Sequence, residues 1–306
     1  MTQFFYAAFG LVFRSAFPVH ALEPRRLPVS ERWDVDICLG DVPSPRGPVA
    51  IDEMFVEISA DAAVLEIPES GVFRIAAGSV MEVRPWPGAT ADQTEAYLLG
   101  TCVAVLLYQR RLLPLHANCV VRGNAAFAVC GDSGAGKSTL AAYFSRAGLP
   151  LLTDDLLAIE QTTQGLKAHA GIPRMKLWRD ALHAFGQTSD GLRPVSWMDD
   201  KFEIPLSQLA SGSFCVGAIY WLRLAENGET AIERLEGAQA VAVIVQNIYR
   251  RQFADMAGES RVYFETAARL AQQVPVFAFS RPAGFEHFEA SAAALVRHMD
   301  AMTEQP

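Results

Sequence analysis

Residues 126–155 read AFAVCGDSGAGKSTLAAYFSRAGLPLLTDD, and their pattern predicts the central part of the fold. The stretch begins with a short apolar run at 126–130 and passes through a glycine-rich segment into residues 138–147, which have helical spacing and end before Gly148. A second apolar run, 149–153, leads directly into two aspartates. The order strand, glycine-rich loop, helix, strand predicts an α/β fold in which the loop lies at the N-terminus of the helix.

The glycine-rich segment fits the pattern G-x-x-x-x-G-K-[ST], in which glycines let backbone N–H groups turn inward around phosphate oxygens. In such a loop the Lys137 ammonium reaches the outer phosphates, and the Ser138 hydroxyl ligates Mg²⁺. The unpaired amides and the dipole of the following helix also favour negative charge. We therefore expect a nucleotide site here. Its residues are Gly131, Asp132, Ser133, Gly134, Ala135, Gly136, Lys137, Ser138 and the adjoining Thr139.

Two aspartates, Asp154 and Asp155, end the second apolar run and indicate what chemistry the nucleotide site performs. After a right-handed crossover this strand runs parallel to the first, so its C-terminal end falls beside the loop. One carboxylate can then hold Mg²⁺, and the other can take a proton from an incoming hydroxyl. The alternative for either residue alone is an aspartate that caps a helix or a turn.

Composition indicates an ordered globular protein. The chain has 306 residues, 51% of them hydrophobic, which is enough for a catalytic domain and a smaller unit. Its formal net charge of −8 argues against nucleic acid or an anionic membrane as the main partner. No apolar stretch reaches the length of a membrane span. The five cysteines are scattered and odd in number, as expected for buried thiols in a reducing cytoplasm.

Two domains are expected. Residues 1–90 alternate short apolar runs with Pro and Gly, which predicts a small β-rich domain with a first strand at 4–13. Residues 91–112 have an acidic start, few helix breakers and a basic end, as in a long buried helix. That helix opens the catalytic domain, residues 91–306.

A hairpin is expected immediately ahead of the loop. Residues 118–122 and 125–130 are runs of strand length on either side of Gly123 and Asn124, a favoured turn. The hairpin folds the start of its first strand back toward the loop, which makes His116 a candidate site residue. A lone histidine is otherwise most simply a hydrogen-bonded polar residue.

A second hairpin is expected near the middle of the catalytic domain. Residues 216–224 and 229–235 are strand-like runs, and Asn227 and Gly228 between them are typical turn residues.

Basic side chains beyond the aspartates are candidate contacts for phosphate or substrate. Each of them alone could instead be a solvated charge or a partner for a helix C-terminus. Two of these basic candidates, Arg174 and Lys176, lie in the segment from Pro173 to Trp178. The candidates are Arg174, Lys176, Lys201, Arg250 and Arg251.

Residues 116–155 resemble the catalytic core of HPr kinase/phosphorylase, a bacterial family whose phosphate loop reads G-D-S-G-x-G-K-S. In that family a strand ending in Asp-Asp follows the loop, and a histidine precedes the loop at the same short distance. The resemblance is closest to the divergent HPr kinase-like proteins associated with peptide tailoring, including lasso-peptide kinases. Their FGL-type first strand, LLPLHA lead-in and P-R-x-K-L-W segment look similar to residues 9–11, 112–117 and 173–178.

The resemblance implies a P-loop kinase core of the HPr kinase type with a smaller β-rich N-terminal domain. It implies transfer of phosphate from ATP to a serine hydroxyl, with Mg²⁺. Carried over by position, residues 131–138 bind ATP and Mg²⁺, and Lys137 and Asp154 are catalytic, Asp154 as general base. Asp155 becomes a metal or loop partner, and His116 lies next to the transition state.

The chain also departs from HPr kinase. Thr139 stands where that family has Glu, and the segment after Asp155 lacks its signature for phosphorolysis. Residues 1–90 do not resemble its regulatory domain. The resemblance therefore supports the kinase reaction more strongly than it supports the family's substrate. Neither HPr as the acceptor nor the reverse reaction is expected.

Two classes of function remain open. The first is a kinase acting on a peptide or protein serine, with a ribosomal precursor of the lasso type as the expected acceptor, or on a small-molecule hydroxyl. The second is a nucleotide-dependent switch without an acceptor. The acidic pair directly behind the loop favours the kinase, because switches usually place the metal-binding aspartate much farther along the chain. The sequence is compatible with a homo-oligomer and does not fix the oligomeric state.

Overall fold

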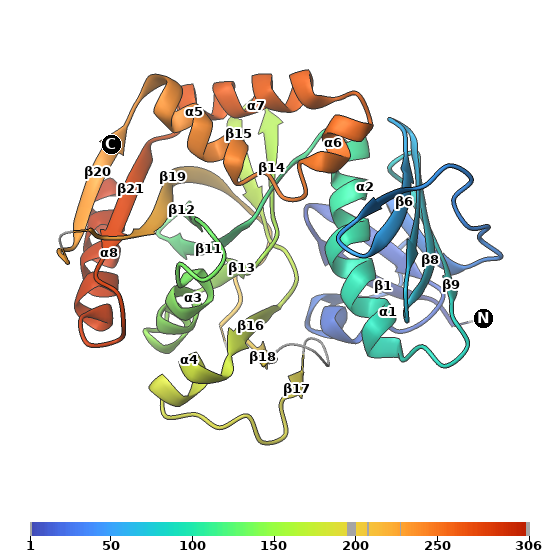
Figure 1. Cartoon of the computed structure of the whole chain (residues 1–306), viewed down its shortest axis with the longest axis horizontal. Helices are drawn as coiled ribbons and strands as arrows, with labels where there is room; N and C mark the ends of the chain where they lie inside the picture. The colour runs from blue at the N-terminus through green and yellow to red at the C-terminus, as the bar shows by residue number, and fades with distance from the viewer. Residues whose placement is uncertain (1, 195–199, 207, 227, 304–306) are drawn as a thin grey trace. The chain divides into compact units, whose positions relative to one another are not determined.

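The computed structural model describes residues 2–194, 200–206, 208–226 and 228–303 (Figure 1). The fold is mixed α/β with a β-rich N-terminal sheet. The chain divides into two compact units. Unit 1 comprises Met1–Pro114 and Tyr249–Tyr263, and unit 2 comprises Leu115–Ile248 and Phe264–Pro306.

Unit 1 is built around a nine-stranded sheet with the order β3-β1-β2-β4-β9-β8-β7-β6-β5. The ladders β2–β4 and β4–β9 are parallel, whereas β6 to β9 form an antiparallel meander. A short 3₁₀ helix, η1 (His20–Arg25), follows β2. The strands are β1 (Phe4–Ala8), β2 (Leu11–Ser15), β3 (Arg26–Leu27), β4 (Val35–Leu39), β5 (Val49–Ile51), β6 (Met54–Ile58), β7 (Ala62–Ile67), β8 (Gly71–Ala76) and β9 (Val80–Pro85).

The single strand expected at 4–13 is wrong, because this segment is the β1–β2 hairpin. Phe9 and Gly10 form its turn with φ values of 56° and 76°. Positive φ at both central residues matches the right-handed twist of the flanking strands. Phenylalanine seldom adopts positive φ, so Gly10 alone marks this turn in an otherwise apolar run.

The long helix expected at 91–112 is present as three consecutive segments, α1 (Ala91–Tyr97), a π-helical turn η2 (Leu98–Cys102) and α2 (Val103–Gln109). Thr90 and Gln93 form a capping box at its start. At its end, Gln109 donates from Nε2 to the carbonyl oxygen of Ile75 at 3.1 Å. This helix therefore packs on the sheet of unit 1, whose first segment runs to Pro114. Unit 1 also contains α6 (Gln252–Met256).

Unit 2 contains a second mixed sheet with the order β10-β14-β15-β19-β12-β11-β13, in which β21 pairs with β19 and β20 pairs with β21. A separate three-stranded sheet has the order β16-β18-β17. β10 (Leu113–Leu115) and α7 (Ser260–Gln273) each cross a unit boundary. The remaining strands are β11 (Ala117–Arg122), β12 (Ala125–Cys130), β13 (Leu151–Thr153), β14 (Leu157–Thr162), β15 (Gly165–His169), β16 (Arg174–Trp178), β17 (Arg193–Pro194), β18 (Lys201–Pro205), β19 (Ser213–Leu224), β20 (Ala231–Leu235) and β21 (Val276–Arg281), and the helices are α3 (Lys137–Arg146), α4 (Arg179–Ala184), α5 (Gly237–Gln246) and α8 (Phe288–Thr303).

The second expected hairpin is wrong in its pairing, although both of its strands exist. β20 pairs with β21 and not with β19, and β21 pairs with β19 in parallel. β21 is buried along its whole length, so it takes hydrogen-bonding partners on both edges. This strand comes from a distant part of the sequence and separates the two runs. Asn227, in the expected turn, lies outside the described residues.

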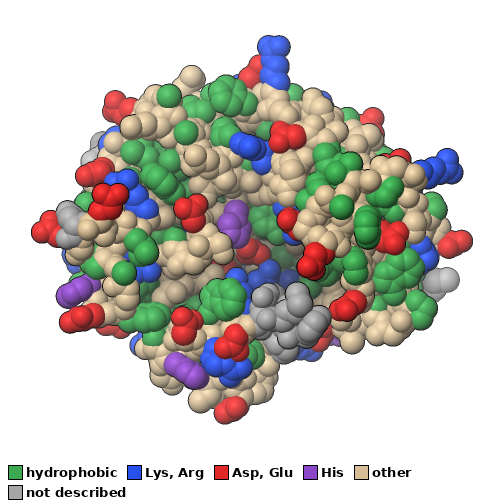
Figure 2. Space-filling view, in the orientation of Figure 1, with side chains coloured by type: hydrophobic (Ala, Val, Ile, Leu, Met, Phe, Trp, Pro, Cys, Tyr) green, Lys and Arg blue, Asp and Glu red, His purple; other side chains and the backbone are tan. Residues whose placement is uncertain are grey.

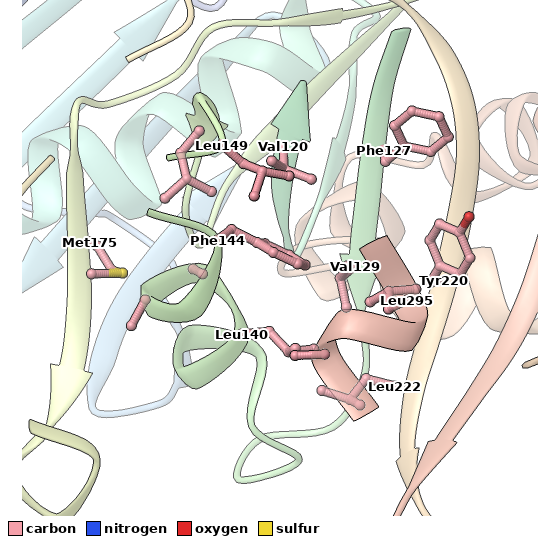
Figure 3. Packing of buried hydrophobic residues seen from close by; sticks show 14 of the residues in the cluster. Val120, Phe127, Val129, Leu140, Phe144, Leu149, Met175, Tyr220, Leu222 and Leu295 are labelled. Atoms are coloured by element: carbon pink, nitrogen blue, oxygen red, sulfur yellow. The ribbon is translucent and has the colours of Figure 1, made fainter. Parts of the chain in front are cut away.

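The core of unit 2 lies between the sheet, α3 and α8. Leu140 and Phe144 of α3 point toward Val120 and Val129 of β11 and β12, beside Leu295 of α8 (Figure 3). All five side chains are fully buried. Burying one such side chain stabilises the fold by about 1.5–3 kcal/mol. This packing fixes the N-terminus of α3, and with it the glycine-rich loop, against the end of the sheet.

Acidic and basic side chains are interspersed on the face of the molecule shown in Figure 2. Among the described helices, none is long and apolar enough to span a bilayer.

Candidate functional site

The main candidate site residues of the sequence lie at one end of three neighbouring strands in the unit 2 sheet, β12, β11 and β13. β11 lies between β12 and β13 and runs antiparallel to both. The register places Ala117 opposite Cys130 and Cys119 opposite Thr153. The start of β11 and the ends of β12 and β13 therefore share an edge, which brings together His116, the glycine-rich loop and the two aspartates. β13 is parallel to β12 in direction, as expected, but the two strands are not neighbours.

The glycine-rich loop depends on its glycines. Gly131, Gly134 and Gly136 have φ values of 147°, 82° and 104°. A Cβ added at Gly131 would lie 2.5 Å from the carbonyl oxygen of Leu222, and one added at Gly136 would lie 2.5 Å from Nη2 of Arg281. Gly131 is therefore required by close approach to backbone as well as by φ, whereas Gly136 is required by its φ, since the Arg281 side chain could move. Gly136 is the left-handed N-cap from which α3 begins.

Lys137 lies beneath the loop with only 9% of its surface exposed. Its Nζ donates to the carbonyl oxygens of Gly131 at 2.6 Å and Asp132 at 3.1 Å. Burial lowers the pKa of the ammonium, and the nearby carboxylates of Asp154 and Asp155 oppose this shift. The ammonium thus donates to the loop's own carbonyl groups. Phosphate oxygens in the same place would accept stronger hydrogen bonds, because they are charged.

A pocket of about 470 Å³ opens beside the loop. Its size is within the range of sites for small molecules and cofactors. The loop and the start of α3 form one side of it, and β16, α4 and the residues after β21 form others. The structure brings ten of the sequence-predicted residues into one cavity, namely His116, Ser133, Gly134, Gly136, Lys137, Ser138, Thr139, Asp154, Asp155 and Lys201.

Asp154 is a buried carboxylate with one described hydrogen-bond donor. It is 6% exposed, and its Oδ2 accepts from the backbone N–H of Lys176 at 3.0 Å. Burial is the main cause that raises its pKa, and the neighbouring charge of Asp155 adds to the shift. Asp154 is therefore the better proton acceptor of the pair.

Asp155 has the opposite environment. Its Oδ2 accepts from the Lys176 ammonium at 2.7 Å, and its Oδ1 lies 3.2 Å from Nδ1 of His116. Burial alone would raise the pKa of Asp155, but Lys176 and His116 outweigh burial and hold the pKa well below its usual range. The backbone has φ of 74°, and its carbonyl oxygen is 3.1 Å from the same His116 nitrogen. Asp155 is thus a fixed anion that orients Lys176 and His116. Two carboxylates whose pKa values are pushed apart are the pattern of an acid–base site.

The basic residues predicted from the sequence have different surroundings. Lys176 reaches the aspartates, as described. Lys201 also lines the pocket, with its Nζ 5.5 Å from the centre of the Trp178 ring. Arg174 forms an ion pair with Glu203 across β16 and β18 and is not one of the lining residues.

Arg250 and Arg251 belong to unit 1. Arg250 pairs with Asp52 at 3.0 Å, and Arg251 lies 4.0 Å from Asp255. Both arginines therefore have carboxylate partners within unit 1.

Five polar residues that line the pocket were missed by the sequence reasoning, namely Asn118, Arg179, Asp180, Asp200 and Arg281. Asn118 was detectable, since it is a polar residue near the start of an otherwise apolar strand. Arg281 was not, because only the β19–β21 pairing brings the end of β21 to the loop.

Replacing Lys176 with methionine should remove the ammonium that holds Asp155. We expect the free energy of unfolding to fall by about 1.5–3 kcal/mol, the scale of a hydrogen bond to a charged group. Since the folded pKa of Asp155 is depressed, this contribution is present above the unfolded pKa and is lost as pH falls through the folded pKa. Urea unfolding at several pH values measures it. Lys167→Met is the control, because Lys167 contacts Gln164 and not a carboxylate; equal losses in the two variants would contradict the assignment.

No family model matches the chain, and no curated protein matches it. Among solved structures, the chain is similar to the HPr(Ser) kinase/phosphatase from Coxiella burnetii, with 13% sequence identity and a TM-score of 0.34. The match covers 62% of this chain and 98% of that chain. A similarity this low assigns no residue of the present chain a role.

Proposed function

We propose that this protein is an ATP-dependent kinase that transfers the γ-phosphoryl group to a serine hydroxyl of a peptide or protein. The observation that carries the proposal is the pair Asp154 and Asp155, one buried with a raised pKa and one fixed as an anion, beside a glycine-rich helix N-terminus. A switch protein needs an anion site for its nucleotide. It has no need of a carboxylate tuned to accept a proton.

The loop would bind the phosphate chain of ATP. Its glycines leave space for close approach, and α3 adds the favourable end of its dipole. Lys137 would exchange the carbonyl oxygens of Gly131 and Asp132 for phosphate oxygens. The exchange favours binding because a hydrogen bond between two charged groups is stronger than one to a neutral carbonyl.

Mg²⁺ fits the oxygen groups that line the pocket. It prefers oxygen ligands and usually takes one or two protein groups together with phosphate oxygens. Ser138, at the start of α3, would supply a hydroxyl, and the aspartates supply carboxylates. Bound Mg²⁺ would neutralise phosphate charge. Both oxygens of Asp155 already lie close to Lys176 or His116, so we assign Asp155 mainly to holding those two side chains.

Groups on this chain would supply the proton acceptor and the positive charge that the transfer step needs. The serine oxygen of the acceptor attacks the γ-phosphorus while the bond between that phosphorus and the β,γ-bridging oxygen breaks, and ADP leaves. Asp154 takes the hydroxyl proton. Lys137 stabilises the charge that develops on the transferred group, and His116 is placed beside it by Asp155.

We further propose that the acceptor is a ribosomally made precursor peptide of the lasso type. The motif resemblance supports this choice. So does the separate sheet of unit 1, whose edge strands β3 and β5 could pair with an extended peptide. Val49 on β5 is half exposed, so this edge presents apolar as well as backbone groups.

The test is to incubate the protein with Mg·ATP and the precursor peptide encoded beside its gene, and to locate any added phosphoryl group by tandem mass spectrometry. We expect a single phosphoserine that is absent when Lys137→Ala is used. An unmodified peptide alongside rapid phosphorylation of a small alcohol would replace the peptide acceptor with a small-molecule hydroxyl.

A further inference from the structure

Two side chains outside the sequence-predicted set tie the glycine-rich loop to two strands. Asn118 on β11 donates from Nδ2 to the carbonyl oxygen of Lys137 at 2.5 Å. Arg281, at the end of β21, donates from Nη2 to the carbonyl oxygen of Ala135 at 3.0 Å. Those two carbonyl groups flank Gly136, where the loop turns into α3. β11 pairs with β12 on one side, and β21 lies on the other side beyond β19, so the loop that follows β12 is held from both sides.

Both of these side chains are unfavourable to bury. Asn118 is 1% exposed, and its Oδ1 has no hydrogen-bond partner. Arg281 is 7% exposed, its Nε has no partner, and its other described bonds go to the carbonyl oxygens of Pro282 and Gly284. No carboxylate pairs with Arg281 among the described residues. Buried polar groups with unused hydrogen-bonding atoms reduce stability, and an unpaired buried charge does so more strongly.

We propose that Asn118 and Arg281 are positioning residues for the phosphate chain of the nucleotide. By holding the carbonyl groups of Ala135 and Lys137, they turn the intervening N–H groups toward the pocket. The guanidinium of Arg281 also adds a positive charge behind the loop, with its Nη2 2.5 Å from the place of a Cβ on Gly136. The inference rests on the proposed function, since the ligand is Mg·ATP.

The stability cost gives the proposal a distinctive test. Arg281→Met and Asn118→Leu keep the approximate size of each side chain and remove its hydrogen-bond donors. Each should raise the Kd of Mg·ATP about tenfold, while kcat at saturating ATP changes less than about threefold. The melting temperature should change little, because the lost donors to the carbonyl groups of Ala135 and Lys137 are offset by removal of two buried polar side chains with unused hydrogen-bonding atoms.

Three further variants sharpen the result. Arg281→Lys keeps a charge and a donor and should recover most of the affinity that Arg281→Met loses. Arg223→Met is the matched control. Arg223 lies on the adjacent strand β19, is partly exposed and contacts Ser280 and Glu233, so Mg·ATP affinity should not change. The double variant Asn118→Leu/Arg281→Met should lose less affinity than the sum of the single variants, because both side chains hold the same segment.

Parallel falls in melting temperature and affinity, or an unchanged Kd in both single variants, would overturn the proposal. A wild-type chain that fails to bind Mg·ATP would overturn the proposed function instead. In that case hydrogen exchange of the amides of residues 131–138, measured on the nucleotide-free protein, still tests whether Asn118 and Arg281 hold the loop. Faster exchange in Arg281→Met and Asn118→Leu supports this role, and unchanged exchange refutes it.

Discussion

Lys137→Ala should reduce kcat/KM for phosphoryl transfer by about 10³-fold and weaken Mg·ATP binding in the same variant. The ammonium is already within the loop, in contact with the carbonyl oxygens of Gly131 and Asp132. Phosphate oxygens in that place would bind it more strongly, both in the ATP complex and as charge develops on the transferred group. Affinity and turnover should therefore fall together.

Isothermal titration with Mg·ATP and steady-state kinetics measure the two effects of this substitution. Lys167→Ala serves as the control, because Lys167 lies on β15 and contacts only Gln164 among its described hydrogen bonds. Circular dichroism verifies that Lys137→Ala is folded, since alanine leaves two loop carbonyl groups without their donor. Full activity with unchanged affinity in a folded Lys137→Ala protein would mean that the loop does not bind the nucleotide.

Asp154→Asn should lower kcat by about 10²–10⁴-fold, the usual scale for loss of a general base, and should leave Mg·ATP affinity nearly unchanged. The amide has the shape of the carboxylate and can still accept the hydrogen bond from the backbone of Lys176. It cannot take a proton. Single-turnover kinetics with preformed ATP complex separates this loss from binding.

The pH profile adds a second measure of Asp154. The base must be ionised, so activity should rise as pH increases through its pKa. Burial raises that pKa, which places the acidic limb above the ordinary range of aspartate near 3.9. The residual activity of Asp154→Asn should lack this acidic limb of the pH profile. If Asp155→Asn is the inactive variant and Asp154→Asn works normally, the roles of the two aspartates are reversed.

The local parts of the site could be predicted from the sequence because their geometry is set within a few residues. Only glycine tolerates the backbone at Gly131 and Gly136, and helix α3 follows from residues with helical spacing. The hairpin of β11 and β12 was also predictable, since its turn residues adjoin two apolar runs. That hairpin brings His116 to the end of the sheet that carries the loop, and the pairing of β11 with β13 brings it to Asp155.

The non-local parts could not be predicted, because no short pattern encodes which distant strands pair. Insertion of β21 next to β19 changed the partner of β20 and brought Arg281 to the loop. The same limit applies to the aspartates. Their place behind the loop predicted one base and one Mg²⁺ partner, but the contact between Lys176 and Asp155 that separates their pKa values comes from β16, about twenty residues farther along.

The most direct test of the kinase is the stoichiometry of a single turnover with [γ-³²P]ATP, Mg²⁺ and the candidate precursor peptide. The proposal predicts one labelled phosphoserine for each ADP formed, with little free phosphate. ADP and labelled inorganic phosphate in equal amounts, with no labelled acceptor, would contradict it and indicate a nucleotide-hydrolysing switch.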